Sequence, residues 1–214
     1  MSSPAAPWTR IYNDVKMHIP GLTDAVFKQV LYSVMDDFLS NTNIWTEEVP
    51  IAIEPNTFTY PFTVSHKGDI KRLMLVYDPA VARPDRQWVQ GGVQMTKPGV
   101  LETRYAPAAA TTWNAVVAKV LGEPVDGAGY PDMEEADHWI VDQYGDGVVS
   151  GIIGRLMAMP AKPYTSASLA KSYWQDYIAE RSKARGDVTK ANVYGGQRWQ
   201  YPQSFATVRR GGWV

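Results

Sequence analysis

The sequence contains no cysteine and only three histidines in 214 residues. Without thiols, the chain cannot form disulfides, thiolate metal sites or a cysteine nucleophile. His18, His66 and His138 lie far apart, and none stands in a His pair with the spacing of a local zinc motif. Long apolar runs are also missing, which predicts no transmembrane helix, and the N-terminal stretch lacks the apolar region of a signal peptide.

A large net charge is absent as well, since 21 Lys and Arg face 22 Asp and Glu. This balance excludes a strongly basic nucleic-acid coat protein and an acidic tail protein. The charge is nevertheless uneven: residues 181–214 carry seven basic side chains and one acidic side chain, a net +6, and the preceding residues carry −7. A hydrophobic fraction of 45% predicts a packed core in one domain, with or without appendages.

Apolar periodicity predicts three main helices. Residues 22–41 place apolar side chains every three or four positions, which is typical of an amphipathic helix. Residues 132–158 keep a similar stripe, although four glycines lower their helix propensity, would allow a kink near 145–147 and would let another helix approach closely. Residues 164–192 form the last helix, and the short connection before it can only join antiparallel neighbours.

The chain between the first two helices is predicted to fold into antiparallel strands. Runs at 48–54 and 57–64 flank a Pro-Asn turn signal and are expected to form a hairpin. Pro50 and Pro61 favour sheet edges or bulges for these two runs, because proline cannot donate to a ladder. Further strands are expected at 70–77, 87–95, 100–105 and 113–120. The last of these is rich enough in alanine to permit a helix instead.

This order of elements predicts an α+β fold. It combines an antiparallel helical bundle of three main helices with an inserted antiparallel β domain and an extended C-terminal arm. The expected boundaries are 1–45 for the N-terminal segment and first helix, 46–121 for the β insert, 122–192 for the long helix hairpin and 193–214 for the arm.

Acidic side chains at the start of the second long helix are the main catalytic candidates. Glu134, Glu135 and Asp137 could supply paired carboxylates for acid–base chemistry. The favoured interpretation is that they complement the positive end of the helix dipole on a solvated face, and Asp36-Asp37 is interpreted in the same way. His138 has no Ser, Cys or metal-ligand partner at a meaningful spacing, and no phosphate-loop motif occurs. We therefore predict no catalytic residue, no metal site and no cofactor.

The C-terminal segment mixes arginines with large aromatic residues and has no regular period. Such a segment could stack on nucleic-acid bases, or it could bury its rings on a protein partner. The acidic body offers no matching basic groove, which favours the protein partner; packing back on its own body is the remaining alternative. The anchors predicted for this arm are Arg198, Trp199, Tyr201, Phe205, Arg209, Arg210 and Trp213.

Two segments resemble the head-to-tail adaptor proteins (head completion or neck connector proteins) of tailed phages. In residues 22–45, LTDAVFKQVLYSVMDDFLSNTNIW, an apolar helix ends near a Trp that leads into the first strand. In residues 145–188, a Gly-rich helix, a short Pro-containing loop and a Tyr- and Trp-bearing helix follow one another. The resemblance covers 22–64 and 131–214 and is carried by pattern and element order. The β insert places the chain nearer to adaptors that present a β domain to tail or fibre components than to compact all-helical ones.

The resemblance implies a structural virion protein at the head-tail junction and not an enzyme. In that family a homo-oligomeric ring, usually of twelve copies, lies below the portal. The C-terminal arm would bind the portal protein, and tail nozzle, tube or fibre proteins would bind below. Genome DNA would pass through the lumen without sequence-specific contact. Assembly would take place in the host cytoplasm, without a membrane partner.

Two alternatives from other classes stay open. One is a small β-domain module that binds a carbohydrate or a peptide through exposed Trp residues. The other is a small hydrolase that uses Glu134 and Asp137.

Overall fold

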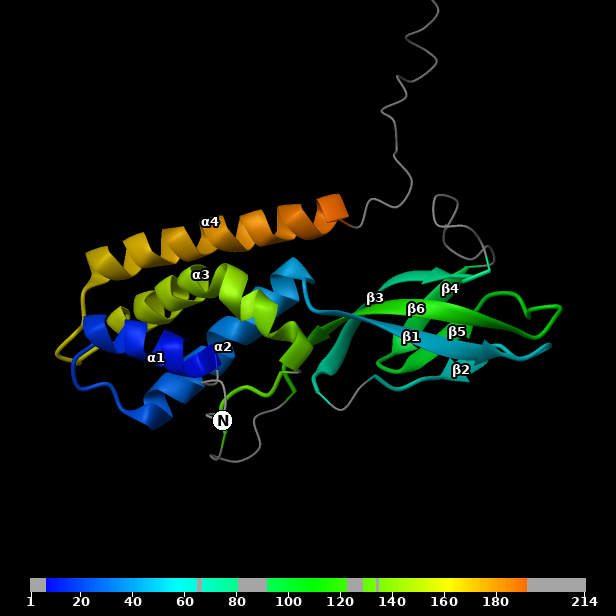
Figure 1. The fold of residues 1–214 in the computed structure, drawn as a ribbon, viewed down its shortest axis with the longest axis horizontal. Helices are drawn as coiled ribbons and strands as arrows, with labels where there is room; N and C mark the ends of the chain where they lie inside the picture. The colour runs from blue at the N-terminus through cyan, green and yellow to red at the C-terminus, as the bar shows by residue number, and fades with distance from the viewer. Residues whose placement is uncertain (1–6, 65–66, 81–91, 123–128, 134, 192–214) are drawn as a thin grey trace, which may run out of the picture.

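The computed structural model describes residues 7–64, 67–80, 92–122, 129–133 and 135–191 (Figure 1). Its described part is an α+β fold in which a helical bundle and a β domain lie at opposite ends of an elongated molecule. Two small antiparallel three-stranded sheets are inserted between the second and third helices, as the sequence predicts. Each end has its own cluster of buried apolar side chains.

The bundle contains four helices in the described residues: the three predicted main helices are confirmed, and one further helix was not predicted. They are α1 (Pro7–His18), α2 (Asp24–Thr42), α3 (His138–Met157) and α4 (Ala167–Ala191). The helix that periodicity did not predict is α1, which buries Trp8, Ile11 and Val15 on one face. Pro7 occupies its first position, where a missing N–H costs nothing. The stripe is only three residues long and follows a Pro-rich start, which hides it in the sequence.

Helix α3 is the centre of the bundle and contacts α1, α2 and α4. Its C-terminal part, residues 151–157, is buried on nearly every side, as expected for a helical segment that is largely apolar. Its N-terminal half has an exposed face that includes Asp142, Gln143 and Asp146. The helix begins at His138, after a 3₁₀ turn η2 (Glu135–Asp137), and ends at Met157. The prediction of one helix from 132 to 158 is therefore too long at its N-terminal end.

The glycines of α3 allow α4 to pack closely against it, as predicted. A Cβ atom added at Gly151 would lie 2.8 Å from Tyr177 Cδ2 and 2.9 Å from Val34 Cγ1. One added at Gly154 would lie 3.2 Å from the backbone of α4. Gly145 differs, since a Cβ atom there would meet nothing within 4 Å. Figure 1 shows that α3 and α4 run antiparallel, which confirms the prediction from their short connection.

Six strands form the β domain in the described residues. They are β1 (Thr46–Ile53), β2 (Thr59–Pro61), β3 (Asp69–Tyr77), β4 (Val93–Lys97), β5 (Val100–Thr103) and β6 (Thr111–Val120). One sheet has the order β1-β6-β3 and the other β2-β5-β4. The alanine-rich run at 113–120 is a strand, so the helical alternative is wrong.

The predicted hairpin of the first two runs does not form. β1 pairs along its whole length with β6, from Thr46 opposite Ala118 to Ile53 opposite Thr111. β2 pairs with β5 in the other sheet. The chain crosses between the sheets at the Pro-Asn turn, where Asn56 has a φ of 60°. The turn signal thus predicted the change of chain direction correctly, but it did not predict the strand partner of β1. That partner is β6, which matches the apolar face of β1 along its whole length.

Candidate functional site

The carboxylate of Asp137 binds a tryptophan and does not face a substrate cleft. Its Oδ2 accepts a hydrogen bond of 2.6 Å from Trp45 Nε1, and the side chain makes no capping bond to α3. The sequence predicts that this carboxylate interacts with the positive end of the helix dipole on a solvated face. In the structure it instead makes a tertiary contact with Trp45. Glu134 and the side chain of Glu135 lie outside the described part of the chain. Among the residues that the structure describes, no three His, Asp or Glu side chains could share a metal ion.

Trp45 connects the bundle to the β domain. Its side chain is fully buried at the point where α2 gives way to β1. Lys119 Nζ, itself 1% exposed, lies 4.5 Å from the Trp45 ring centroid and 2.8 Å from Glu47 Oε2. Gly68, with a φ of +83°, lies so close that a Cβ atom would come within 2.6 Å of the ring. The buried charge is paired and stacked, so this junction is well suited to holding the two ends of the molecule together.

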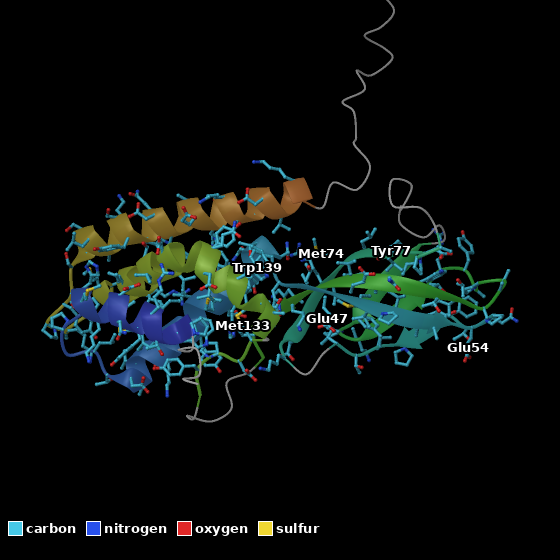
Figure 2. All side chains as sticks on the ribbon, in the orientation of Figure 1. Glu47, Glu54, Met74, Tyr77, Met133 and Trp139 are labelled. Carbon is cyan, nitrogen blue, oxygen red and sulfur yellow. The ribbon has the colours of Figure 1, made fainter. Side chains whose placement is uncertain are left out.

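Figure 2 places Glu47 and Met133 beside this junction and Glu54 at the far end of the β domain. Met133 belongs to the bundle core and is 3% exposed. The described polar groups at the junction thus lie among packed side chains and not around an open cavity.

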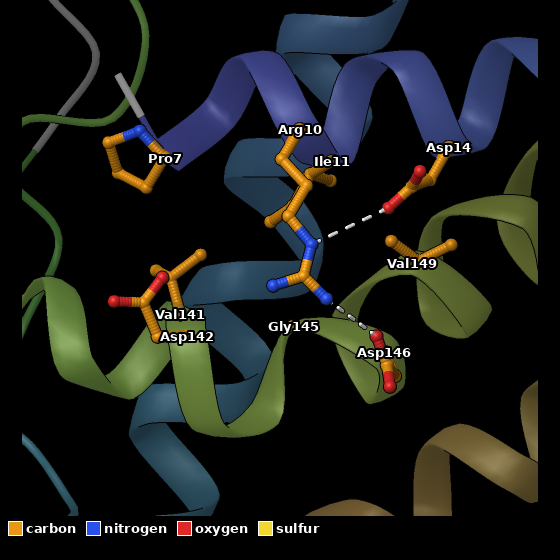
Figure 3. Close-up of a pocket in the computed structure, with 9 residues that line it drawn as sticks. All are labelled: Pro7, Arg10, Ile11, Asp14, Val141, Asp142, Gly145, Asp146 and Val149. Carbon is orange, nitrogen blue, oxygen red and sulfur yellow. Dashed lines mark hydrogen bonds and ion pairs between the residues drawn. The ribbon is translucent and has the colours of Figure 1, made fainter. Parts of the chain in front are cut away.

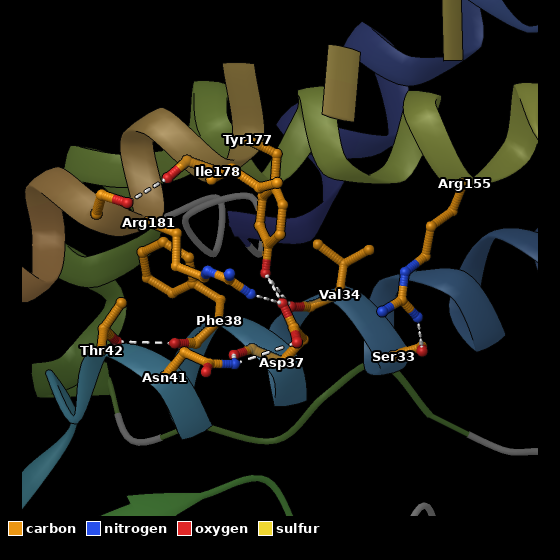
Figure 4. A network of polar contacts seen from close by, with 11 residues as sticks. Ser33, Val34, Asp37, Phe38, Asn41, Thr42, Arg155, Tyr177, Ile178 and Arg181 are labelled. Carbon is orange, nitrogen blue, oxygen red and sulfur yellow. Dashed lines mark hydrogen bonds and ion pairs between the residues drawn. The ribbon is translucent and has the colours of Figure 1, made fainter. Parts of the chain in front are cut away.

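A second polar network joins α2 to α4 (Figure 4). Asp37 Oδ2 accepts hydrogen bonds from Tyr177 OH at 2.6 Å and from Arg181 Nη1 at 2.7 Å. Burial of the phenol, together with its hydrogen bond to Asp37, raises the pKa of Tyr177 strongly. Asn41 Nδ2 also binds Asp37, whereas Asp36 is exposed. Asp36 therefore lies on the solvated face that the sequence predicts, whereas Asp37 links α2 to α4 through its hydrogen bonds.

A small pocket separates α1 from α3 (Figure 3). It has a volume of about 170 Å³ and opens above Gly145. Arg10 crosses it, with 3.3 Å to Asp146 Oδ1 and 3.9 Å to Asp14 Oδ2. Arg10 and Asp146 are largely exposed, so these ion pairs contribute little to stability. No nucleophile with an adjacent base lines the pocket, and its charges already compensate one another.

A larger groove of about 480 Å³ lies between β1 and β2, the outer strands of the two sheets. Both predicted edge positions are confirmed, because Pro50 lies in β1 and Pro61 in β2. Beyond this groove, the tip of the β domain exposes Phe58 by 53% and Tyr105 by 64%. The described residues of these surfaces carry no acid–base pair.

Exposed tryptophans, which a carbohydrate-binding module would use, are few in the described residues. Trp8, Trp45 and Trp113 are buried, and Trp174 is partly buried. Trp139, near the start of α3, is 45% exposed.

The arm predicted from sequence lies outside the described residues, which end at 191. The positions concerned are Arg198, Trp199, Tyr201, Phe205, Arg209, Arg210 and Trp213. Sequence reasoning also missed the roles of Asp37 and Trp45. Their partners are separated from them by 140 and 92 positions, so no local spacing signals either contact.

No family model matches this chain, and a search of curated proteins finds no significant relative. None of the described helices is long and apolar enough to cross a membrane. Any functional conclusion therefore depends on the fold, on the contacts described above and on the resemblance in element order.

Proposed function

We propose that this chain is a ring-forming structural subunit of a tailed-phage head-to-tail adaptor. In this role it links the portal to the tail and surrounds the DNA conduit. The observation that carries the proposal is the order of elements: an apolar helix that ends shortly before Trp45, a β insert, and a long antiparallel helix hairpin followed by a basic, aromatic-rich segment. This order resembles that of the adaptors that present a β domain, and the insert distinguishes the chain from the compact all-helical ones.

The division of the molecule supports a linking role. The bundle and the β domain lie at opposite ends, so each can contact a different neighbour in an assembly (Figure 1). Helix α4 buries Ala170, Tyr177 and Ala184, which recur every seven residues, and much of its remaining surface is exposed. That surface is available to another subunit. The C-terminal end of α4 lies at the end of the hairpin that is nearer to the β domain (Figure 1).

The described carboxylates support a structural role over hydrolysis. Asp137 is occupied by Trp45, and Asp37 by Tyr177 and Arg181. A general acid or base needs a free path to its substrate, and these two groups are committed to tertiary contacts. The hydrolase alternative would have to use Asp137 at the expense of the junction.

The test combines the purified chain with the portal protein encoded in the same genome. Native mass spectrometry should detect portal rings that carry several 23.8 kDa subunits. A variant lacking 196–214 should keep its circular dichroism spectrum and unfolding midpoint but fail to join the portal. Failure of the full-length chain to bind portal rings, or equal binding by the truncated chain, would refute the proposal.

A charge-matched control separates specific docking from general attraction. Replacing Arg209 and Arg210 by Gln should weaken binding to the portal by at least about tenfold, since interfacial arginines often dominate binding energy. The same charge change at Lys71 and Arg72, which are exposed on β3, should have a much smaller effect. Equal losses in both pairs would mean that only net charge matters.

A further inference from the structure

The groove between β1 and β2 is a slot on the open side of the β domain. Its floor consists of buried side chains from the inner faces of both sheets, including Val49, Ile51, Tyr60 and Phe62. Its rim consists of exposed or partly exposed residues, namely Pro50, Ala52, Glu54, Thr57, Thr59, Pro61 and Thr63. Within the described part of the chain, neither β1 nor β2 pairs with a second strand on this side. The slot is therefore bordered by two strand edges.

The ladder register shows which backbone groups of β1 face the slot. Lys119 N donates to Trp45 O at 2.7 Å, so residues 45, 47, 49 and onward pair with β6. Backbone groups alternate in direction along an antiparallel strand. The groups of Glu48, Pro50 and Ala52 therefore point away from β6 and into the slot.

The same reasoning applies to β2. Thr103 N donates to Phe58 O at 2.9 Å, and Phe62 N donates to Gly99 O at 2.8 Å. The positions between these two bonds alternate in the same way, which directs Thr59 and Pro61 toward the slot. Each wall thus has a proline at an outward position.

These prolines change what the slot can bind. Each removes an N–H donor from its wall and keeps a carbonyl acceptor. A continuous added strand needs both donors and acceptors, and proline on an edge strand disfavours such addition. A ligand that brings extra N–H donors is favoured instead. Arginine has five N–H donors and no acceptor, so it fits a wall that is rich in acceptors.

The charge of the slot agrees with this conclusion. Glu54 is the one charged residue among the described residues that line it, and it is exposed. Glu48, in β1, does not add to this charge, because its carboxylate accepts hydrogen bonds from Tyr77 and Asn114 on the side of β6 and β3. No basic side chain is found among the described residues that line the slot. The hydroxyl oxygen of Tyr60 lies 2.6 Å from the carbonyl oxygen of Thr57 and 3.0 Å from that of Glu54, and its single O–H is shared between these two acceptors, which fixes the turn that carries Glu54.

We propose that this slot binds an extended, arginine-bearing peptide segment of another protein. The guanidinium group would donate to the carbonyls around Pro50 and Pro61 and face Glu54, while apolar neighbours of the arginine would cover the floor. The proposal goes beyond the adaptor function and does not depend on it, because one copy of the chain contains the whole slot.

Two synthetic peptides test the proposal on the full-length chain. The first is an acetylated, amidated peptide with alternating Thr and Val and two Arg residues. The second replaces both Arg residues by citrulline, which has nearly the same shape but no charge. The Arg peptide should bind about tenfold more tightly or better in fluorescence anisotropy, as charge-assisted hydrogen bonds are the stronger ones. Its amide shift changes in NMR should fall on residues 48–54 and 57–63.

Matched variants then locate the site. Ala52→Arg adds a positive charge at an exposed position of β1 and should lower the affinity for the Arg peptide by about tenfold or more. Thr96→Arg adds the same charge at an exposed position of β4, in the other sheet, and should leave binding nearly unchanged. Glu54→Gln removes charge without adding bulk, and it should weaken binding even if Ala52→Arg fails to fold.

Three results would overturn the proposal. The first is equal binding of the Arg and citrulline peptides, including no binding of either. The second is equal loss in the Ala52→Arg and Thr96→Arg variants, or no loss in Glu54→Gln. The third is much tighter binding by a chain lacking 196–214, which would identify the chain's own C-terminal segment as the occupant of the slot.

Discussion

Two glycine-to-alanine substitutions in the same helix should have opposite effects on stability. Gly145 and Gly151 are both buried in the interior of α3, and neither has a positive φ. Alanine is about 1 kcal/mol more favourable than glycine inside a helix, so both substitutions gain the same backbone contribution. They differ in what the new methyl group meets.

At Gly145 the methyl group enters open space, since nothing lies within 4 Å of the added Cβ atom. At Gly151 it meets Tyr177 at 2.8 Å and Val34 at 2.9 Å. Both neighbours are fully buried, and Tyr177 is held further by its hydrogen bond to Asp37. Overpacking of this kind costs about 1–3 kcal/mol. Gly145→Ala should therefore stabilise the chain by up to about 1 kcal/mol, while Gly151→Ala should range from neutral to destabilising by about 2 kcal/mol.

The assay is urea unfolding followed by circular dichroism, with the wild-type chain measured in parallel. The two variants should differ by about 1–3 kcal/mol in the free energy of unfolding obtained from the urea curves. If both variants gain stability equally, α4 does not contact α3 at Gly151 and the close packing of the two helices is wrong. If both lose stability equally, the open space above Gly145 is wrong.

Three other perturbations follow from the contacts. Leu156→Asp should unfold the bundle or destabilise it by several kcal/mol in the same urea assay, because it places an unpaired charge at a position with 0% exposure; a parent-like midpoint would contradict the placement of Leu156. Asp137→Ala should lower the free energy of unfolding by about 1–3 kcal/mol, because it leaves Trp45 Nε1 without its acceptor. Asp137→Asn should lower it less, because an amide oxygen can still accept the hydrogen bond. Equal losses of stability in the two variants would mean that this hydrogen bond is not the cause. Burial, with a hydrogen bond to Asp187, raises the pKa of Tyr144 to about 12. The contribution of this phenol to the free energy of unfolding is therefore complete below pH 10 and is lost between pH 10 and 12, because the phenol of the unfolded chain ionises first. Tyr144→Phe should make the free energy of unfolding less dependent on pH in that window, and an unchanged slope would refute this.

Periodicity predicted the helices well where one apolar face is long. The expected helix at 22–41 is α2 (Asp24–Thr42), and the last helix is α4 (Ala167–Ala191). It failed for α1, whose buried face consists of only three residues. So short an apolar face can be recognised only from the surface against which it packs. That surface belongs to α3, which begins more than a hundred positions later.

Strand pairing could not be predicted for a related reason. Alternation located most strands, and Pro50 and Pro61 predicted edges correctly. The partner of β1, however, is β6, which starts 58 positions after β1 ends. A turn fixes direction locally, whereas pairing is selected by the fit of two apolar faces across the sandwich. The contacts of Asp37 and Trp45 belong to the same class, since each joins elements that are remote in sequence.

Residues that are poor choices locally become explicable through their neighbours in the fold. Gly151 weakens a helix by propensity, and the ring of Tyr177 explains it. Pro50 and Pro61 weaken strands, and the absence of a described strand partner on that side allows them. A sequence that folds to one structure keeps such conflicts where something compensates for them. The glycines have their compensation within the chain, in α4. The two prolines have theirs in the slot they border, which is why a ligand rich in N–H donors is the partner to test there first.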